Sequence, residues 1–247
     1  AGPLALILVA LIGVGPLLRW RRDAVKPVLR RVAPAAIVTA VMLIAVKLAA
    51  PHMHILPLSG LALAFGAGLA SIAPLWRRNL LRTPLFTWGM VVAHLGVAVS
   101  LACIACDSSF TVEKLVAARL GETVQVGPYQ VHFAGLAPTF GSNWQALEAR
   151  LEIRRGAGDA LILKPQARAY WAPPTETSES AIHTALDGQL YTVLGKPAGE
   201  GRWQLRLWWK PFVTLIWGGG VLVACGGALA LLGRLRRGRR RPQEVWE

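Results

Sequence analysis

The residue with the clearest chemical potential is His94, because it lies in the middle of a long apolar stretch. Residues 85–106 contain no Asp, Glu, Lys or Arg. At membrane depth an imidazole has no water to bond with, and groups there that ionise or bind metals usually mark pathways or cofactors. From the residues alone, two interpretations of His94 are evenly matched: a hydrogen bond to a neighbouring helix, or ligation.

The neighbours of His94 in the sequence are small. This helix has a small cross-section, so a neighbouring helix or a flat cofactor could approach closely. The small residues are Gly89, Ala93, Gly96 and Ala98. Haem is the large planar ligand that an intramembrane histidine would bind, but His94 could supply only one axial ligand.

Cys103 and Cys106 form a CIAC sequence near the end of the same stretch. Helical spacing places them on one face, which permits a disulfide or dithiol in an oxidising compartment. No second CxxC and no following histidine support a redox or haem-attachment motif. We favour packing for this pair, and packing also for Cys225 in the last apolar stretch.

The other histidines give weaker signals. His52 and His54 form an HxH pair in a predicted turn, but they have no Cys or carboxylate neighbours to complete a metal site. His132 falls in a predicted strand and His183 follows a polar loop. We interpret both as histidines that lie at the surface or have their hydrogen bonds satisfied. No order of Ser, His and Asp, no phosphate loop and no paired carboxylates are recognisable. The sequence therefore predicts no catalytic residue.

Hydropathy predicts an integral membrane protein with five helical spans. Of the 247 residues, 54% are hydrophobic, and each apolar stretch approaches the ~20 residues needed to cross a bilayer. The first span is short and, because Ala1 is not a start Met, the chain looks truncated or processed at its front. The predicted organisation is a four-helix region 1–106 (spans about 3–18, 32–50, 55–75 and 85–106), a periplasmic β-rich domain 107–210, a final helix 211–233 and a basic tail 234–247.

The net charge of +14 would ordinarily suggest nucleic acid, but the basic residues are placed as a topology signal. They cluster after the first, third and fifth predicted spans, which lie on one side of the membrane if the chain alternates. The positive-inside rule puts these segments in the cytoplasm. We therefore expect a bacterial inner-membrane protein with a periplasmic N-terminus and a cytoplasmic C-terminus, in contact with lipid and not with nucleic acid.

Residues 107–210 carry strand patterns. Leu147, Ala149, Leu151 and Ile153 alternate with charged residues, a period of two that is typical of a half-buried strand. Residues 111–120 favour an amphipathic helix leading out of the membrane. The other strands are predicted at 123–126, 129–133, 160–164, 167–171, 189–194 and 203–209. Short strands separated by turns indicate an all-β small barrel or sandwich inserted before the last helix.

The sequence Trp208, Trp209, Lys210 directly precedes the last span. Indoles favour the headgroup layer and lysine extends its charge toward water, so we interpret these residues as a membrane-interface anchor. Lys47, near the outer edge of the second span, is expected to extend to water in the same way.

Five segments match a family in order along the whole chain. The chain resembles the C-terminal part of the CcmF family of c-type cytochrome biogenesis proteins, bacterial haem lyases with relatives in nitrite-reductase maturation. The segments are GPLLRWRR at 15–22, MVVAHLGVA at 90–98, GETVQVGPY at 121–129, TSESAI and LYTVLG within 177–195, and a Trp-rich stretch within 203–218.

The resemblance implies that the protein takes haem from a periplasmic haem chaperone and, with a thiol-handling maturation subunit, helps attach it to CxxCH cysteines of apocytochrome c. It also implies a membrane-embedded b haem that keeps the delivered haem iron reduced. One histidine ligand of that haem lies in the AHLGVA-type span, which assigns axial ligation of the haem iron to His94. Nothing is carried onto the other histidines.

The family's other haem-binding histidines and its WWD segment belong to its N-terminal half, which this sequence does not contain. We therefore expect the second axial ligand to come from that half or from a partner subunit, and the chain alone to be inactive. Two other functions stay open: a membrane transporter component for haem or a small molecule, and a non-catalytic scaffold whose periplasmic domain docks assembly partners.

Overall fold

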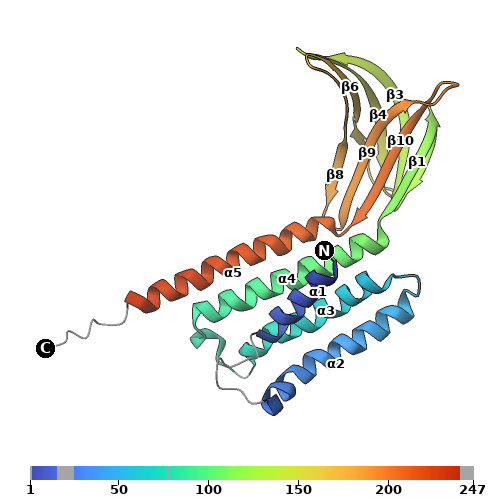
Figure 1. Cartoon of the computed structure of the whole chain (residues 1–247). Coiled ribbons are helices and arrows are strands. Elements are labelled where there is room, and N and C mark those ends of the chain that lie inside the picture. The colour runs from blue at the N-terminus through green and yellow to red at the C-terminus, as the bar shows by residue number, and fades with distance from the viewer. Residues whose placement is uncertain (1, 16–24, 77, 240–247) are drawn as a thin grey trace. The chain divides into compact units, whose positions relative to one another are not determined.

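The structure is a computed structural model that describes residues 2–15, 25–76 and 78–239. It divides into two compact units (Figure 1). We call the first, Ala1–Ser109 with Leu215–Glu247, the helical unit, and the second, Phe110–Thr214, the β-domain. The β-domain is thus an insertion before the last helix.

The described chain contains four helices that are long and apolar enough to cross a membrane. A fifth apolar helix, α1, has 13 residues, and the end of its predicted span, 16–18, lies outside the described residues. The 3-10 turns η2 (Ala73–Leu75) and η3 (Leu80–Arg82) lie between the third and fourth helices. The helices are α1 (Gly2–Val14), α2 (Val25–Ala49), α3 (Ile55–Ile72), α4 (Leu85–Phe110) and α5 (Val213–Arg239).

Helix α2 begins at Val25, before the predicted start of the second span at residue 32. Its first turns therefore include Lys26, Arg30 and Arg31. Lys and Arg are good helix formers whose charged ends can reach beyond an apolar layer, so a helix can extend past its hydrophobic segment.

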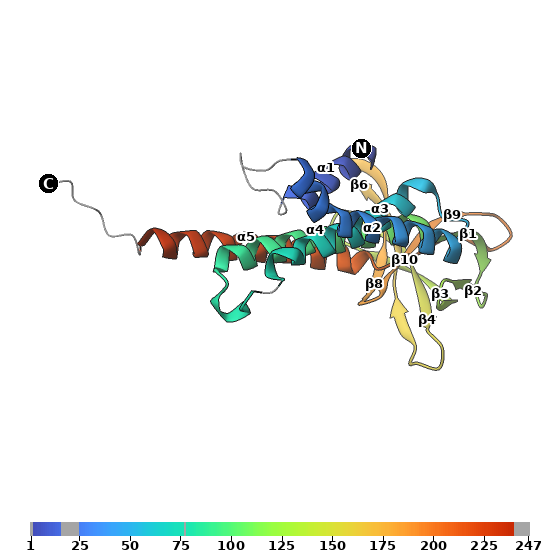
Figure 2. The same ribbon diagram turned by 90° about the horizontal axis from the view of Figure 1, so that it is seen from below.

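Small residues set the packing of the helical unit. Helix α3 packs against α1 and α2, and its buried positions are mostly Gly and Ala. Helices α4 and α5 run alongside each other (Figures 1 and 2). A Cβ added at Gly96 would lie 2.6 Å from the carbonyl oxygen of Gly219, and one at Gly226 would lie 2.5 Å from that of Gly89. Only glycine allows the two backbones to approach so closely.

The β-domain is a pair of antiparallel sheets. One has the order β1-β10-β9-β8, and the other has the order β2-β3-β4-β6-β7 with β5 also paired to β4. The predicted fold class, apolar helices with an all-β domain inserted before the last of them, is confirmed. The strands are β1 (Val112–Arg119), β2 (Thr123–Val126), β3 (Tyr129–Phe140), β4 (Trp144–Arg154), β5 (Leu161–Leu163), β6 (Gln166–Trp171), β7 (Pro174–Glu179), β8 (Ala181–Ala185), β9 (Gly188–Pro197) and β10 (Arg202–Pro211).

Alternation along the strands builds the core between the two sheets. In β4, Ala149, Leu151 and Ile153 are buried, as their period of two predicts. They pack in one cluster with Phe133 of β3 and with leucines of β9 and β10. The burial of these large side chains is the main favourable contribution to the stability of the β-domain.

Three strands differ from the sequence-based expectation. Residues 111–120 were predicted to be a helix, but Val112–Arg119 forms the edge strand β1, paired with β10 from Val112 opposite Trp209 to Arg119 opposite Arg202. The edge strands β7 and β8 were not predicted. Edge strands have a partner on one side and show weaker alternation, so pairing with a distant strand decides their structure.

Candidate functional site

His94 lies near the middle of α4 and its side chain is half-buried. Its Nδ1 is 2.7 Å from the backbone carbonyl oxygen of Met90, one turn earlier. A carbonyl can only accept, so Nδ1 carries the hydrogen and donates it. In the neutral imidazole this bond selects one tautomer, in which the lone pair lies on Nε2.

That tautomer suits metal ligation. Histidines that bind metals usually donate their other ring N–H to a carbonyl or carboxylate, which fixes the ring and raises the basicity of the ligating nitrogen. Met90 supplies such a carbonyl from the main chain of the same helix. His94 is therefore prepared to offer Nε2 to a metal, although packing without a ligand would be compatible with the same hydrogen bond.

The small residues around His94 are used for helix packing. Gly89, Ala93 and Gly96 face α5, and Ala98 lies against Gly68 of α3. At 100° per residue, His94 lies about 140° around the helix from Gly89. The close approach that the sequence predicted is thus made by α5, and His94 projects away from that contact.

Among the described residues, no group of three or more His, Cys, Asp or Glu side chains is arranged to hold a metal ion. His52 and His54 are exposed and follow α2. The turn there is closed by Lys47, whose ammonium donates to the carbonyl oxygens of Pro51 at 2.7 Å and Met53 at 3.4 Å. Lys47 therefore binds main-chain oxygens at the helix end.

The cysteines of α4 are free thiols. Cys103 is buried and Cys106 is half-buried, an arrangement that fits packing. The packing prediction for Cys225 is wrong within this chain, because that residue is exposed. Its neighbour Gly226 is the one that faces α4, and adjacent helical residues point about 100° apart.

Both histidines of the β-domain have partners there. His132 Nδ1 lies 3.1 Å from the Thr123 hydroxyl at the surface. The ring of His183 meets that of Tyr129 edge to face, with 5.9 Å between centroids. Both arrangements agree with the interpretation of these residues as histidines whose polar groups have partners within the protein.

The prediction of a membrane-interface anchor at Trp208 and Trp209 is wrong for Trp209. Trp209 is 8% exposed and belongs to the core of the β-domain, where its ring meets that of Tyr129 at 5.3 Å. Trp208 faces the other side of β10, where the Arg206 guanidinium stacks on it at 4.5 Å. Because neighbouring strand residues point to opposite faces, only one of the two could face outward.

A cluster that the sequence did not reveal lies where β10 ends. Arg155 forms an ion pair of 2.6 Å with Asp187, and its guanidinium lies over the rings of Tyr129 and Trp209. The hydrogen bond from Arg155 lowers the pKa of the Asp187 carboxyl, and Asp187 in turn raises the pKa of Arg155. Any two of these four residues are at least 22 positions apart in the sequence, so no local motif could have identified the cluster.

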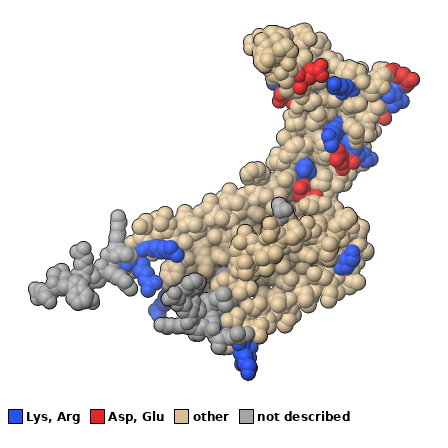
Figure 3. Space-filling view, in the orientation of Figure 1, with Lys and Arg blue, Asp and Glu red and all other residues tan. Residues whose placement is uncertain are grey.

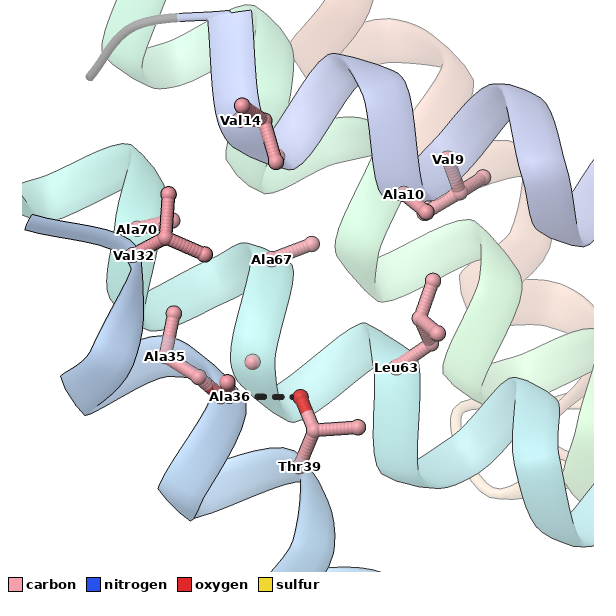
Figure 4. A pocket seen from close by; sticks show the side chains of 12 residues that line it. Val9, Ala10, Val14, Val32, Ala35, Ala36, Thr39, Leu63, Ala67 and Ala70 are labelled. Atoms are coloured by element: carbon pink, nitrogen blue, oxygen red, sulfur yellow. Dashed lines mark hydrogen bonds between the residues drawn. The ribbon is translucent and has the colours of Figure 1, made fainter. Parts of the chain in front are cut away.

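An apolar pocket lies between α1, α2 and α3 (Figure 4). Thr39 is its polar residue, and its hydroxyl donates to the carbonyl of Ala35 at 2.9 Å. The pocket can receive an apolar group but contributes no ionisable side chain. Its lining residues are Val9, Ala10, Gly13, Val14, Val32, Ala35, Ala36, Thr39, Leu63, Gly66, Ala67 and Ala70.

Comparison with known proteins gives consistent matches. The family described as CcmF C-terminal beta-sandwich matches residues 109–211. Cytochrome c-type biogenesis protein CcmF of Escherichia coli K12 is 34% identical over 238 residues, which cover 95% of this chain and 37% of the relative. CcmF of Haemophilus influenzae is 32% identical over 241 residues, covering 92% and 37%.

A solved structure named Cytochrome c Heme Lyase CcmF superimposes with a TM-score of 0.67 at 25% sequence identity. The match covers 93% of this chain and 39% of that one. The chain thus spans little more than a third of the length of the relatives it matches.

Proposed function

Because the chain belongs to the CcmF family of cytochrome c-type biogenesis proteins, we propose that it acts as the C-terminal part of a cytochrome c haem lyase. In this role it receives haem from a periplasmic haem chaperone and helps attach it to apocytochrome c. The chain corresponds to 37% of the length of its relatives, so the activity requires the N-terminal half of the protein or a partner subunit.

The observation that carries the proposal is the state of the His94 ring. Its Nδ1 donates to the carbonyl oxygen of Met90, which in the neutral imidazole leaves Nε2 as the ligating nitrogen, inside a helix that is long and apolar enough to cross a membrane. We assign His94 as one axial ligand of a membrane b haem. The chemistry that haem b supplies when bound is one-electron transfer.

The residues of this chain do two things for that cofactor. The main chain at Met90 orients the imidazole and fixes its tautomer. The contact between α4 and α5, through Gly96 and Gly219, holds the helix that carries His94 in a fixed position. The second axial ligand would come from outside this chain.

The orientation in the membrane follows from charge. Basic residues lie at the start of α2, between α3 and α4, and at the end of α5. If successive helices cross the membrane in opposite directions, these three places lie on the same side of it. The residues are Lys26, Arg30, Arg31, Arg78, Arg82, Arg234, Arg236 and Arg237. All described acidic residues except Asp107 of α4 lie in the β-domain, and the view in Figure 3 shows acidic side chains in that part of the chain. The positive-inside rule would place that end in the cytoplasm and the β-domain in the periplasm of a bacterial inner membrane.

A periplasmic β-domain would meet the other components of the pathway. Its sheets carry charged and aromatic side chains on their outer faces, among them Arg168 stacked on Trp144 at 4.3 Å. We propose that it docks the apocytochrome and the thiol-handling maturation subunit, while haem arrives from the chaperone on the same side.

Absorption spectroscopy tests the assignment of His94. The chain is assembled with the N-terminal half in detergent, and His94→Ala is compared with His132→Ala, which removes a half-buried histidine of the β-domain. We expect His94→Ala to lose the b-type haem bands and His132→Ala to keep them. Added imidazole should restore the bands in His94→Gly, because it can enter the space left by the ring.

An unchanged b-type spectrum in His94→Ala would show that His94 is not a ligand. A loss of the bands that imidazole does not restore would indicate that His94 serves helix packing instead. Both results leave the family membership intact, because it rests on the sequence match and the fold.

A further inference from the structure

The turn between β8 and β9 exposes a leucine. Leu186 is 82% exposed, and it is followed by Asp187 and Gly188, the latter with a φ of +156°. Turns are usually built from Gly, Asn, Asp and Ser, which water solvates well. A leucine at such a tip is available to an apolar environment outside the β-domain when its turn lies beside one.

Hydrogen bonds tie this turn to the start of α5. The amide of Phe212 donates to the carbonyl oxygen of Asp187 at 2.7 Å, and the hydroxyl of Thr214 donates to that of Ala185 at 2.9 Å. Helix α5 begins at Val213 and is long and apolar enough to cross a membrane. The turn must therefore lie at about the same depth in the membrane as the first residues of α5.

The polar groups beside the turn are already paired. Asp187 binds Arg155, and Arg155 covers the rings of Tyr129 and Trp209. Two large apolar side chains are left exposed in the turn and directly before α5: Leu186 and, at 41%, Phe212. Leu186 and Phe212 are therefore candidates for the membrane-interface anchor that the sequence predicted at Trp209.

We propose that the β8–β9 turn inserts Leu186 into the boundary between headgroups and acyl chains of the lipid bilayer, with Phe212 beside it. The partner is the bilayer itself, because the turn is bonded to the first residues of a membrane-crossing helix. Apolar burial drives the insertion, so zwitterionic lipid suffices. This inference is independent of haem binding.

A matched reference position lies at the other end of the same sheet. Leu120 is 55% exposed in the turn between β1 and β2, beside Arg119, which pairs with Arg202 at the start of β10. Gly188, two residues after Leu186, pairs with Pro211 at the end of β10. The ten residues of β10 separate the two turns by about 30 Å.

The native chain is reconstituted in phosphatidylcholine vesicles that contain a phospholipid with a diazirine in its acyl chain. After irradiation, we expect carbene adducts on the peptide that contains Leu186 and none above background on the peptide that contains Leu120. Equal labelling of the two peptides, or labelling of neither, would overturn the proposal.

A second measurement uses Leu186→Cys and Leu120→Cys in a background with Cys103, Cys106 and Cys225 replaced by Ala, each carrying a bimane fluorophore. The label at 186 should lose emission to a brominated phospholipid and be protected from aqueous iodide. The label at 120 should show the reverse. If iodide quenches both equally, the turn lies in water and the proposal is wrong.

Discussion

The helical unit and the β-domain fill their interiors with opposite kinds of residue. Buried positions of α3 are mostly Gly and Ala, and α4 meets α5 at glycines. The interior of the β-domain is made of large side chains such as Phe133, Leu151 and Leu205, each 0% exposed. The two units therefore depend on different sources of stability.

The solvent explains the difference. In water, burial of large apolar side chains lowers the free energy, so the β-domain places them between its sheets. In a bilayer, lipid tails are as apolar as leucine, and helices gain by close contact of their backbones. Large side chains of α5, such as Trp217 and Val221, are accordingly exposed in this chain, where lipid would cover them.

Phe133→Ala should have the largest effect, because the β-domain depends on large side chains. We expect the free energy of unfolding of the β-domain to fall by about 3–5 kcal/mol, from lost apolar burial and the cavity left behind. Hydrogen exchange of amides in β3 and β4 measures this change without including the helices.

Phe140→Ala is the control for this substitution, because Phe140 lies on the same strand and is 70% exposed. It should change the same free energy by no more than about 0.5 kcal/mol. Similar losses in the two variants would contradict the importance of the core position.

In the helical unit the opposite substitution should be the harmful one. A side chain at Gly226 would strike the backbone of Gly89 and the Cβ of Ala93, so Gly226→Val should lower the free energy of unfolding by about 1–3 kcal/mol. Thermal melting in detergent, followed by helical circular dichroism, measures the loss.

Gly227 is the next residue of α5 and has nothing within 4 Å of an added Cβ. Gly227→Val should therefore keep a melting temperature close to that of the original chain. A comparable drop in both variants would mean that helix propensity, and not the contact with α4, is the cause.

The smallest expected effect concerns the ion pair at the end of β10. Because Arg155 lowers the pKa of Asp187, the pair stabilises the β-domain above the unfolded-state value of about 4, and the contribution is lost as pH falls through the lower folded value. Both side chains are at least 40% exposed, so the contribution should be about 1 kcal/mol or less.

The pH dependence of hydrogen exchange in the β-domain measures it. Asp187→Asn should flatten the dependence below about pH 4, whereas Asp159→Asn, at an exposed position between β4 and β5, should leave it unchanged. A flat profile in the original chain would indicate that the pair contributes nothing.

Much of the fold could be predicted from local patterns. The alternation at Leu147 to Ile153 predicted β4, and the predicted strand 123–126 coincides with β2. The edge strand β1 was missed because its eight residues are fixed by pairing with β10, about 90 positions later in the chain. The exposed Leu186 was missed because an isolated leucine carries no local signal.

The candidate site, like the fold, could be predicted from the sequence only in part. The sequence placed His94 within a span and identified the small residues around it, but it left open whether those residues face a cofactor or a helix. The contacts of Gly89 and Gly96 with α5 answer that question. Axial ligation by His94 stays a prediction.

What the sequence by itself determined is local: the apolar stretches, the position of His94 within one of them, and the strand period of two. These depend on neighbours along the chain, and hydrophobicity alone reveals them. The tertiary structure decided which face of α4 meets α5, that Trp209 is buried, and that the turn with the exposed Leu186 is bonded to the first residues of α5. Those outcomes depend on which distant segments pack together, and no local pattern encodes that.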